Sequence, residues 1–375
     1  MLVHLVILNR NGRASLAECL PSVLLAARRS RHRCDIAVVD NDSSGDSGAW
    51  LAEHFPSVRV IRRPDRGRCG HNEFVGTLSG RIAVLLDGDV RLAEESIDPL
   101  VEPLLAEQSD CLMTVPLCRR FGEERYEGFR TAVGWQWGLV QPTAHFPGHV
   151  AGIDRPGPTA SAGKVMAIDC RKFLELGGFD PLYLPGPFED FDFAFRGFLR
   201  GYWACYVPES LCWHCGPTGL GGPIGREDFA RLALRNVLLF EWKNLRDPMH
   251  VARCLLGLVA RWGLEVATMP WTSPDRRWVL NGALAAAVRR YQRSRAATAE
   301  KSDSGRMSGD CGCRLKTTLW REREFFERFS PERMADAAAK ECGTTPTTAT
   351  RKTAALPMIS GPKFQAASRE AGRVR

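Results

Sequence analysis

The sequence RIAVLLDGDV, residues 81–90, decides the fold of this chain. Residues 82–86 are a short apolar run that ends abruptly in an aspartate, a glycine and a second aspartate. Such a run is typical of a strand buried on both faces of a parallel sheet. Ligands of open α/β sheets bind beyond the carboxyl ends of the strands. Asp87 and Asp89 therefore predict a hard-oxygen site for Mg²⁺ or Mn²⁺ with a polyphosphate, although an Asp-Gly pair is also common in simple turns.

The residues before this strand alternate between apolar strands and helices. We expect strands at 2–8, 35–40 and 58–61, and helices at 14–29, 46–55 and about 70–78. This alternation predicts an α/β fold with a Rossmann-like, mostly parallel sheet. Polar residues stand where the strands end or the third helix begins: Asn9, Asn11, Asp40, Asn41 and Asn72. Each is suited to bind a nucleotide at that sheet edge, and each is equally suited to turn or capping roles.

A helix with an aromatic stripe is expected further along the chain. Its apolar face comprises Phe188, Phe191, Phe195, Phe198 and Tyr202, spaced by three and four residues. Glu189 and Asp190 lie in its first turn, and Asp192 is placed to pair with Arg196 at i, i+4. Acids are also favoured at a helix start by the helix dipole alone.

Shorter elements are expected between the central strand and this helix. Helices are predicted at 92–108 and 171–176, and strands near 111–115, 163–168 and 204–207. Residues 119–162 carry many glycines and prolines and predict an irregular loop region over the site.

The sequence divides into three parts. Residues 1–225 predict a catalytic α/β domain, and residues 226–290 a helical extension with helices at 229–242 and 250–269. Residues 291–375 are biased towards alanine, serine, threonine and arginine, which predicts a disordered basic tail with an isolated helical turn at 321–329.

Charge and cysteine content limit the class of protein. Residues 289–375 carry 19 Lys+Arg against 10 Asp+Glu, a net +9, and residues 1–288 carry a net −1. A basic tail suggests an anionic partner such as lipid headgroups, and a neutral body argues against a nucleic-acid binder. The 13 cysteines are irregularly spaced, and we find neither a secretory signal nor an apolar run of spanning length. These features predict a reducing, cytoplasmic location.

Eight of these segments, in order, resemble the family 2 glycosyltransferases of the GT-A fold. They are ILNRNG (7–12), VVDNDSSGDS (38–47), RGRCGHNEFVGTLSG (66–80), LLDGDV (85–90), GGFDP (177–181), FEDFDFAFR (188–196), GYWACYVPES (201–210) and WHCG (213–216). The likeness covers about residues 1–245, and RNVLLFEWKN (235–244) is similar to the post-catalytic helix of rhamnosyltransferase-like members. The Gly-rich segment departs from the family in being more cationic, with Arg68 and His71.

The resemblance implies a metal-dependent, inverting hexosyltransferase that uses a nucleotide-diphosphate sugar. It implies Asp87 and Asp89 as the DxD metal ligands, with Asp87 also contacting the donor and His214 adding a nitrogen ligand. Asp190 is the implied general base, with Glu189 the second candidate. The implied acceptor is a glycan or a lipid-linked molecule, as in polysaccharide or cell-wall biosynthesis.

Three other interpretations remain open. A catalytically silent binding module for sugar nucleotides or glycans would have the same fold, but the acids at 87, 89 and 190 are intact. A nucleotidyltransferase would share the sheet and the metal, but it needs a longer Gly-rich loop after the first strand. Cys212 and Cys215 have CxxC spacing, and with Cys311 and Cys313 they allow a zinc site or are incidental.

The helices at 229–269 have apolar faces interrupted by arginines. Such helices can lie in a membrane interface, and a basic tail adds attraction to anionic lipids. We therefore expect either a peripheral enzyme on the cytoplasmic face of a membrane, or helices that simply pack on the catalytic domain.

Overall fold

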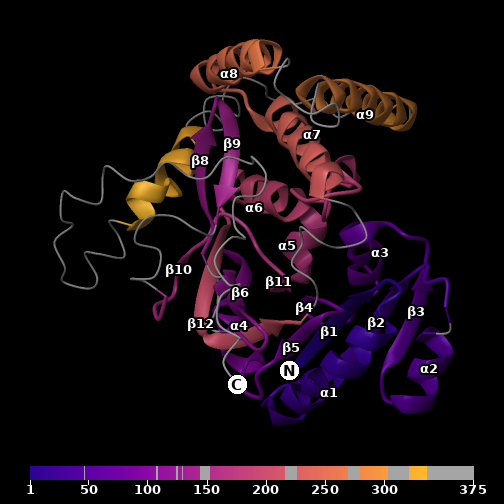
Figure 1. The fold of residues 1–375 in the computed structure, drawn as a ribbon. Coiled ribbons are helices and arrows are strands. Elements are labelled where there is room, and N and C mark those ends of the chain that lie inside the picture. The colour runs from indigo at the N-terminus through magenta and orange to yellow at the C-terminus, as the bar shows by residue number, and fades with distance from the viewer. Residues whose placement is uncertain are drawn as a thin grey trace, which may run out of the picture.

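The computed structural model describes residues 1–45, 47–106, 109–123, 126–128, 130–143, 153–215, 226–268, 279–302 and 321–335. Its N-terminal part is a parallel sheet of β1 (Leu2–Asn9), β2 (Arg33–Asn41), β3 (Arg59–Arg63) and β4 (Ile82–Asp87), in the order β4-β1-β2-β3. The connections contain α1 (Arg13–Arg29), α2 (Ser47–His54), the 3₁₀ turn η1 (Gly67–Cys69) and α3 (Gly70–Val75). This part of the fold confirms the predicted alternation (Figure 1).

The sheet continues beyond β4 with strands of mixed direction. In order across the sheet these are β11 (Val165–Asp169), β6 (Cys111–Arg120), β12 (Trp203–His214) and the short β10 (Gly157–Pro158). β11 runs antiparallel to both β4 and β6, whereas β12 runs parallel to β6. Two further short strands, β5 (Val90–Leu92) and β7 (Tyr126–Gly128), pair with β12 and β6 respectively.

Helices cover both faces of this sheet. On one face α1 and α4 (Ile97–Leu105) bury side chains such as Leu20 and Leu100 against the side chains that β1 and β4 point towards that face. On the other face Phe74 of α3, Phe173 of α5 (Cys170–Glu175) and Phe193 of α6 (Glu189–Leu199) share a second core. The strands are therefore buried on both sides, as their continuous apolar runs predict.

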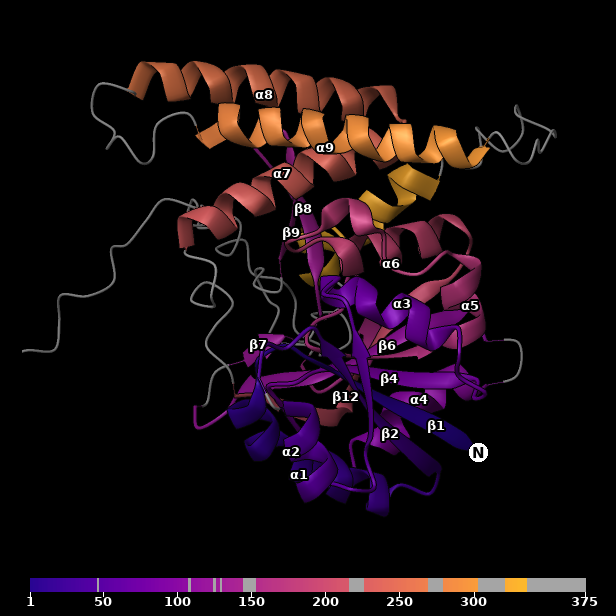
Figure 2. The ribbon, with the colours of Figure 1, turned by 90° about the vertical axis from the view of Figure 1, so that its right-hand side faces the viewer.

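A third core lies along the face of α6 that points away from the sheet. It contains α7 (Arg226–Asn244), the hairpin β8 (Ala132–Gln136) and β9 (Leu139–Thr143), and side chains of α8 (Pro248–Thr268) and α9 (Val279–Ser302). Figure 2 shows α8 and α9 running across this end of the molecule, above α7. Four residues of the predicted stripe, Phe188, Phe191, Phe195 and Phe198, are buried in this core, whereas Tyr202 lies beyond the end of α6 and packs against the second core.

The structure corrects the expectations for the loop and the tail. Residues 119–162 are not wholly irregular, because β8 and β9 form a hairpin whose turn residues Trp137 and Gly138 have φ of 51° and 77°. Positive φ at both turn positions matches the twist of paired strands. The predicted disorder from 291 is wrong for residues 291–302 and 321–335, which are helical or closely folded. The segment at 321–329 is not isolated, since Phe325 and Phe329 are buried against α6.

The predicted helix at 92–108 is also too long. Val90–Leu92 is strand β5, which pairs with Cys212–His214 of β12, and the helix begins only at Ile97. Among the described residues no helix is both long enough and apolar enough to cross a membrane.

Candidate active site at the carboxyl edge of the sheet

The ends of β1, β2 and β4 meet at one edge, as predicted. In the sheet register Asn9 lies opposite Asp40, and Leu8 lies opposite Asp87. Asn9 Nδ2 donates to Asp40 Oδ1 at 3.3 Å, and both side chains are buried. Asn11, at a positive φ of 52°, accepts from the Ser44 backbone N–H at 2.9 Å and so shapes the turn beside this pair.

The two other predicted amides, Asn41 and Asn72, differ in whether a polar atom remains available to bind a ligand. Asn41 donates to the Gly67 carbonyl at 2.9 Å, while its buried Oδ1 has no hydrogen-bond partner among the described residues. Asn72 uses both halves of its amide on Phe179, with Nδ2 at 2.6 Å from the carbonyl oxygen and Oδ1 at 2.9 Å from the N–H. Asn72 therefore ties α3 to the segment before α6, and we leave it out of the proposed donor site.

Asp87 faces two cations, Arg68 and Lys164, that were not among the predicted site residues. Arg68 Nη2 lies 3.3 and 3.2 Å from its two oxygens, and Lys164 Nζ lies 3.1 Å from Oδ2. Burial raises the pKa of Asp87, but the charges of Arg68 and Lys164 outweigh it and hold that pKa well below the ordinary value. The sequence features that could have indicated these two residues are an arginine in the Gly-rich segment and a lysine directly before the strand at 165.

Asp89 lies in a separate chain of contacts with β12. His214 Nε2 is 2.9 Å from Asp89 Oδ2, and His214 Nδ1 is 2.5 Å from Glu127 Oε2. Burial raises the pKa of Asp89, but the hydrogen bond from His214 and the charge of Lys164 lower it below its ordinary value. Its other oxygen, Oδ1, is buried and has no hydrogen-bond partner among the described residues.

Glu189 and Asp190 reach the same cluster from the start of α6. Arg68 Nε lies 3.6 Å from Glu189 Oε1, and Arg68 Nη1 lies 3.9 Å from Asp190 Oδ2. Burial raises the pKa of Glu189 to about 7 despite the opposing charge of Arg68, with the charge of Asp190 adding to the rise. Burial also raises the pKa of Asp190 against the charge of Arg68 and a hydrogen bond with the Ser161 side chain.

The backbone that leads into these acids is strained and tightly held. Phe188 has φ of 103°, a conformation that bulky residues rarely adopt and that costs on the order of 1–3 kcal/mol. Asn236 of α7 donates to the carbonyls of Tyr183 and Pro187 at 2.7 and 2.6 Å, and Arg235 donates to that of Pro185 at 2.8 Å. These contacts from α7 fix the turn that points Glu189 and Asp190 towards Arg68.

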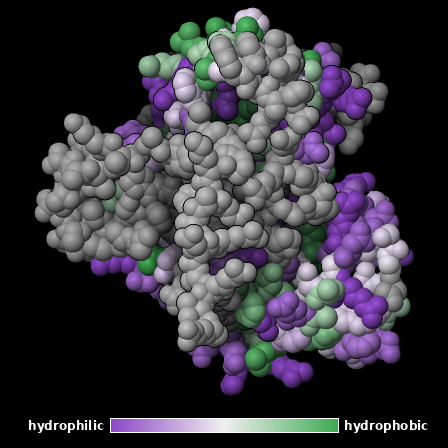
Figure 3. All heavy atoms as spheres, viewed as in Figure 1, coloured by the Kyte–Doolittle hydropathy of each residue, from purple (hydrophilic) through white to green (hydrophobic). Residues whose placement is uncertain are grey.

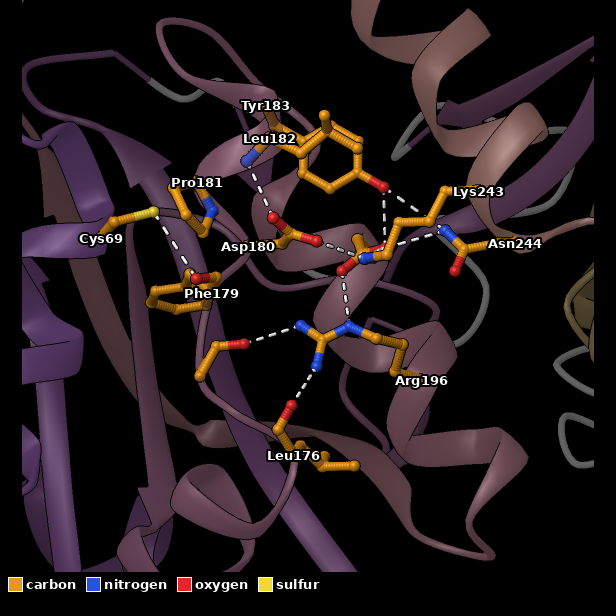
Figure 4. Close-up of polar contacts among 12 residues, drawn as sticks. Cys69, Leu176, Phe179, Asp180, Pro181, Leu182, Tyr183, Arg196, Lys243 and Asn244 are labelled. Atoms are coloured by element: carbon orange, nitrogen blue, oxygen red, sulfur yellow. Dashed lines mark hydrogen bonds and ion pairs between the residues drawn. The ribbon is translucent and has the colours of Figure 1, made fainter. Parts of the chain in front are cut away.

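Asp192 has a structural role, as the predicted pairing with Arg196 indicates. Its Oδ2 accepts from Arg196 Nε at 2.6 Å, and its Oδ1 accepts at 2.8 Å from each of Tyr183, Lys243 and Asn244. Figure 4 shows these donors converging from α6, α7 and the turn before α6. The carboxylate is fully buried, and four donors satisfy it.

The residues fit a divalent cation only in part. No group of three or more His, Cys, Asp or Glu side chains in the described part of the chain is arranged to hold a metal ion. The predicted trio is therefore not brought together, because Asp87 is turned to Arg68 and Lys164. The pair of Asp89 and His214 remains suitable, since Asp89 Oδ1 is buried without a partner and Mg²⁺ or Mn²⁺ needs only one or two carboxylates beside phosphate oxygens and water.

The CxxC pair does not form a recognisable zinc site in the described residues. Cys212 is fully buried beside the Cys118 thiol, and Cys215 lies near Cys19. Cys311 and Cys313 lie outside the described residues.

The chain is similar to known glycosyltransferases over part of its length. Residues 3–158 match the family model described as glycosyl transferase family 2. Two curated relatives from Drosophila melanogaster are each 27% identical: "Putative polypeptide N-acetylgalactosaminyltransferase 10", over 48% of this chain and 30% of the relative, and "N-acetylgalactosaminyltransferase 7", over 56% and 38%. The chain thus spans about a third of the length of these relatives.

Among solved structures, a crystal structure of GalNAc-T7 with UDP, GalNAc and Mn²⁺ aligns with a TM-score of 0.47 and 20% identity, over 62% of this chain and 47% of that chain. The likeness of residues 235–244 to rhamnosyltransferase-like members stays a prediction. The likeness to glycosyltransferase family 2 lies in the N-terminal region, residues 3–158.

Proposed function

We propose that this protein is a divalent-cation-dependent glycosyltransferase that moves a sugar from a nucleotide-diphosphate donor to a hydroxyl group of an acceptor. The observation that carries the proposal is the position of Arg68. One guanidinium lies within 3.9 Å of Asp87 at the nucleotide edge and of Glu189 and Asp190 at the start of α6. The donor edge and the candidate bases therefore belong to one site.

The residues divide into groups with different tasks. Asn9, Asp40 and Asn41 line the ends of β1 and β2, where buried amide and carboxylate groups can recognise a base or ribose hydroxyls. Asp89 and His214 would hold the divalent cation, which, when bound, neutralises the charge of the departing diphosphate. Lys164 and Arg68 are cations that can add to this neutralisation once the donor competes with Asp87 for them.

Asp190 is the general base that we propose. Its carboxylate would take the proton of the acceptor hydroxyl as that oxygen bonds to the anomeric carbon. The bond between the anomeric carbon and the diphosphate oxygen breaks at the same time, and the nucleoside diphosphate leaves with the electron pair. A single displacement of this kind inverts the anomeric centre. Glu189 is the second candidate, because its Oε2 is buried with no hydrogen-bond partner among the described residues.

The acceptor that we propose is a glycan or a lipid-linked molecule, of the kind used in polysaccharide or cell-wall assembly. A lipid-linked acceptor would be met by a peripheral enzyme at the cytoplasmic face of a membrane. The names of the curated relatives supply the alternative, a polypeptide acceptor. The sugar and the base of the donor are to be found by experiment.

A panel of nucleotide sugars tests the proposal. With Mn²⁺ present, at least one donor should raise the unfolding temperature and be slowly hydrolysed, and Asp89→Ala should abolish both effects. Asp228→Ala, at an exposed position of α7, is the matched control and should behave as the parent. A donor that stabilises the protein but is never hydrolysed or transferred would favour the silent binding module, and no stabilisation by any donor would reject the family-based assignment of function.

A further inference from the structure

Helix α8 turns an apolar face away from the rest of the protein. Among the described residues 15 large apolar side chains are exposed, and eight of them lie on the 21 residues of α8. Met249, Leu256 and Val259 are 74, 72 and 69% exposed. An outward face of a helix in contact with water normally carries charged or polar residues, so a continuous apolar face marks an interaction site.

The tip of the β8–β9 hairpin extends this face. α8 packs so closely on the tip that a Cβ on Gly257 would lie 2.1 Å from the Trp137 carbonyl oxygen. Trp137 is 50% exposed beside it, and Trp262 of α8 is 51% exposed. Figure 1 shows the hairpin ending at α8, and Figure 3 shows hydrophobic residues gathered at that end of the molecule. Half-exposed tryptophans next to aliphatic side chains are typical of proteins that rest in a lipid interface.

Nearly all the charged side chains around this apolar face are positive. Residues 248–268 and 279–294 contain five arginines and a single acid, Glu265. That acid is half-buried and accepts from the Leu280 N–H at 3.0 Å, so the described side chains of α8 and α9 present no fully exposed carboxylate. Arg253, Arg289 and Arg293 are exposed. An anionic partner is therefore favoured.

We propose that this surface, formed by α8, the hairpin tip and the exposed side of α9, docks on an anionic lipid bilayer. The helix would lie in the headgroup region with Leu256 and Val259 inserted and the arginines near lipid phosphates. A second copy of the chain fits less well, because a two-fold interface sets the same patch against itself and would bring arginine towards arginine. The inference rests on the proposed function only in that a membrane would hold a lipid-linked acceptor.

Co-sedimentation of the full chain with vesicles tests this inference. We expect binding to phosphatidylcholine vesicles that contain phosphatidylglycerol at low salt, weaker binding at high salt, and little binding without phosphatidylglycerol. Leu256→Ser and Val259→Ser should each lower partitioning at least about tenfold, or about 1.4 kcal/mol. These substitutions are neutral, so the loss reports apolar insertion rather than added charge. Leu174→Ser, at a 47% exposed position of α5, is the matched control and should bind as the parent.

Two further measurements separate the possible failures. Hydrolysis of a soluble donor by the same samples reports the proposed activity without a membrane, and the serine variants should retain it. Active protein that ignores anionic vesicles at low salt would overturn the inference and leave the function standing. Equal binding by parent and serine variants would overturn it as well, and so would a concentration-dependent dimer that the serine variants abolish.

Discussion

Glu241 is a buried acid outside the active site, and it should make the stability of the protein fall as pH rises. The side chain is 3% exposed in the third core, where Oε1 accepts from the Val140 N–H at 2.8 Å and Oε2 has no hydrogen-bond partner among the described residues. Burial raises the pKa of Glu241 from its ordinary 4.5 to about 7. A difference of one in pKa corresponds to about 1.4 kcal/mol, so ionising Glu241 costs the folded state about 3 kcal/mol.

The direction in which stability changes with pH follows from whether the folded or the unfolded chain holds the proton. Below pH 4.5 the carboxyl is protonated in both the folded and the unfolded chain, and its burial carries no charge penalty. Between pH 4.5 and 7 only the unfolded chain has lost the proton, so the contribution of Glu241 to stability is lost progressively. Above pH 7 the penalty is constant. Glu241→Gln keeps an acceptor for Val140 but cannot ionise.

Urea unfolding followed by tryptophan fluorescence at several pH values measures this effect. Relative to the parent at the same pH, Glu241→Gln should gain about 3 kcal/mol more at pH 8 than at pH 4. A difference between Glu241→Gln and the parent that stays constant from pH 4 to pH 8 would refute the reasoning.

Three further predictions concern the site and its support. Asp89→Ala should abolish transfer and weaken Mn²⁺-dependent nucleotide binding, and a titration of this variant that matches the parent would remove the metal assignment. Asp190→Asn should lose at least about 10²-fold in turnover while still binding donor, whereas normal turnover there together with a dead Glu189→Gln would move the base to Glu189. Phe325→Ala should cost about 3–5 kcal/mol in urea unfolding, because Phe325 is buried against the rings of Phe191, Phe195 and Phe198 of α6, and a loss below about 1 kcal/mol would mean that the C-terminal helix is not part of the core.

The local sequence pattern was sufficient to predict the parallel N-terminal part of the sheet and the positions of the polar residues at its strand ends. The apolar runs of β1, β2 and β4 alternate with helices, so their topology and the meeting of Asn9, Asp40 and Asp87 at one edge followed from general rules. The neighbours of Asp87 did not follow. Arg68 and Lys164 are 96 residues apart in sequence, and only the insertion of β11 beside β4 brings both to one carboxylate.

The C-terminal region shows a second limit of sequence reasoning. The segment at 321–329 is rich in arginine and glutamate, and its sequence indicated only an isolated helical turn. Its three phenylalanines have partners more than a hundred residues away, on α6, and no local period reveals that pairing.

That long-range pairing has a consequence for how the protein is made. The stripe of α6 is synthesised by residue 199, but Phe325, Phe326 and Phe329 leave the ribosome last among the described residues that cover it. At 5–20 residues per second, translation from Leu199 to Met334 takes roughly 7–27 s. Throughout that interval the helix that begins with Glu189 and Asp190 lacks part of its packing, so the candidate site gains its full support only after these three phenylalanines have been made. A ribosome that stalls within α9 would release a protein whose sheet is complete but whose α6 phenylalanines are not fully covered. Chaperones and proteases would recognise such a protein.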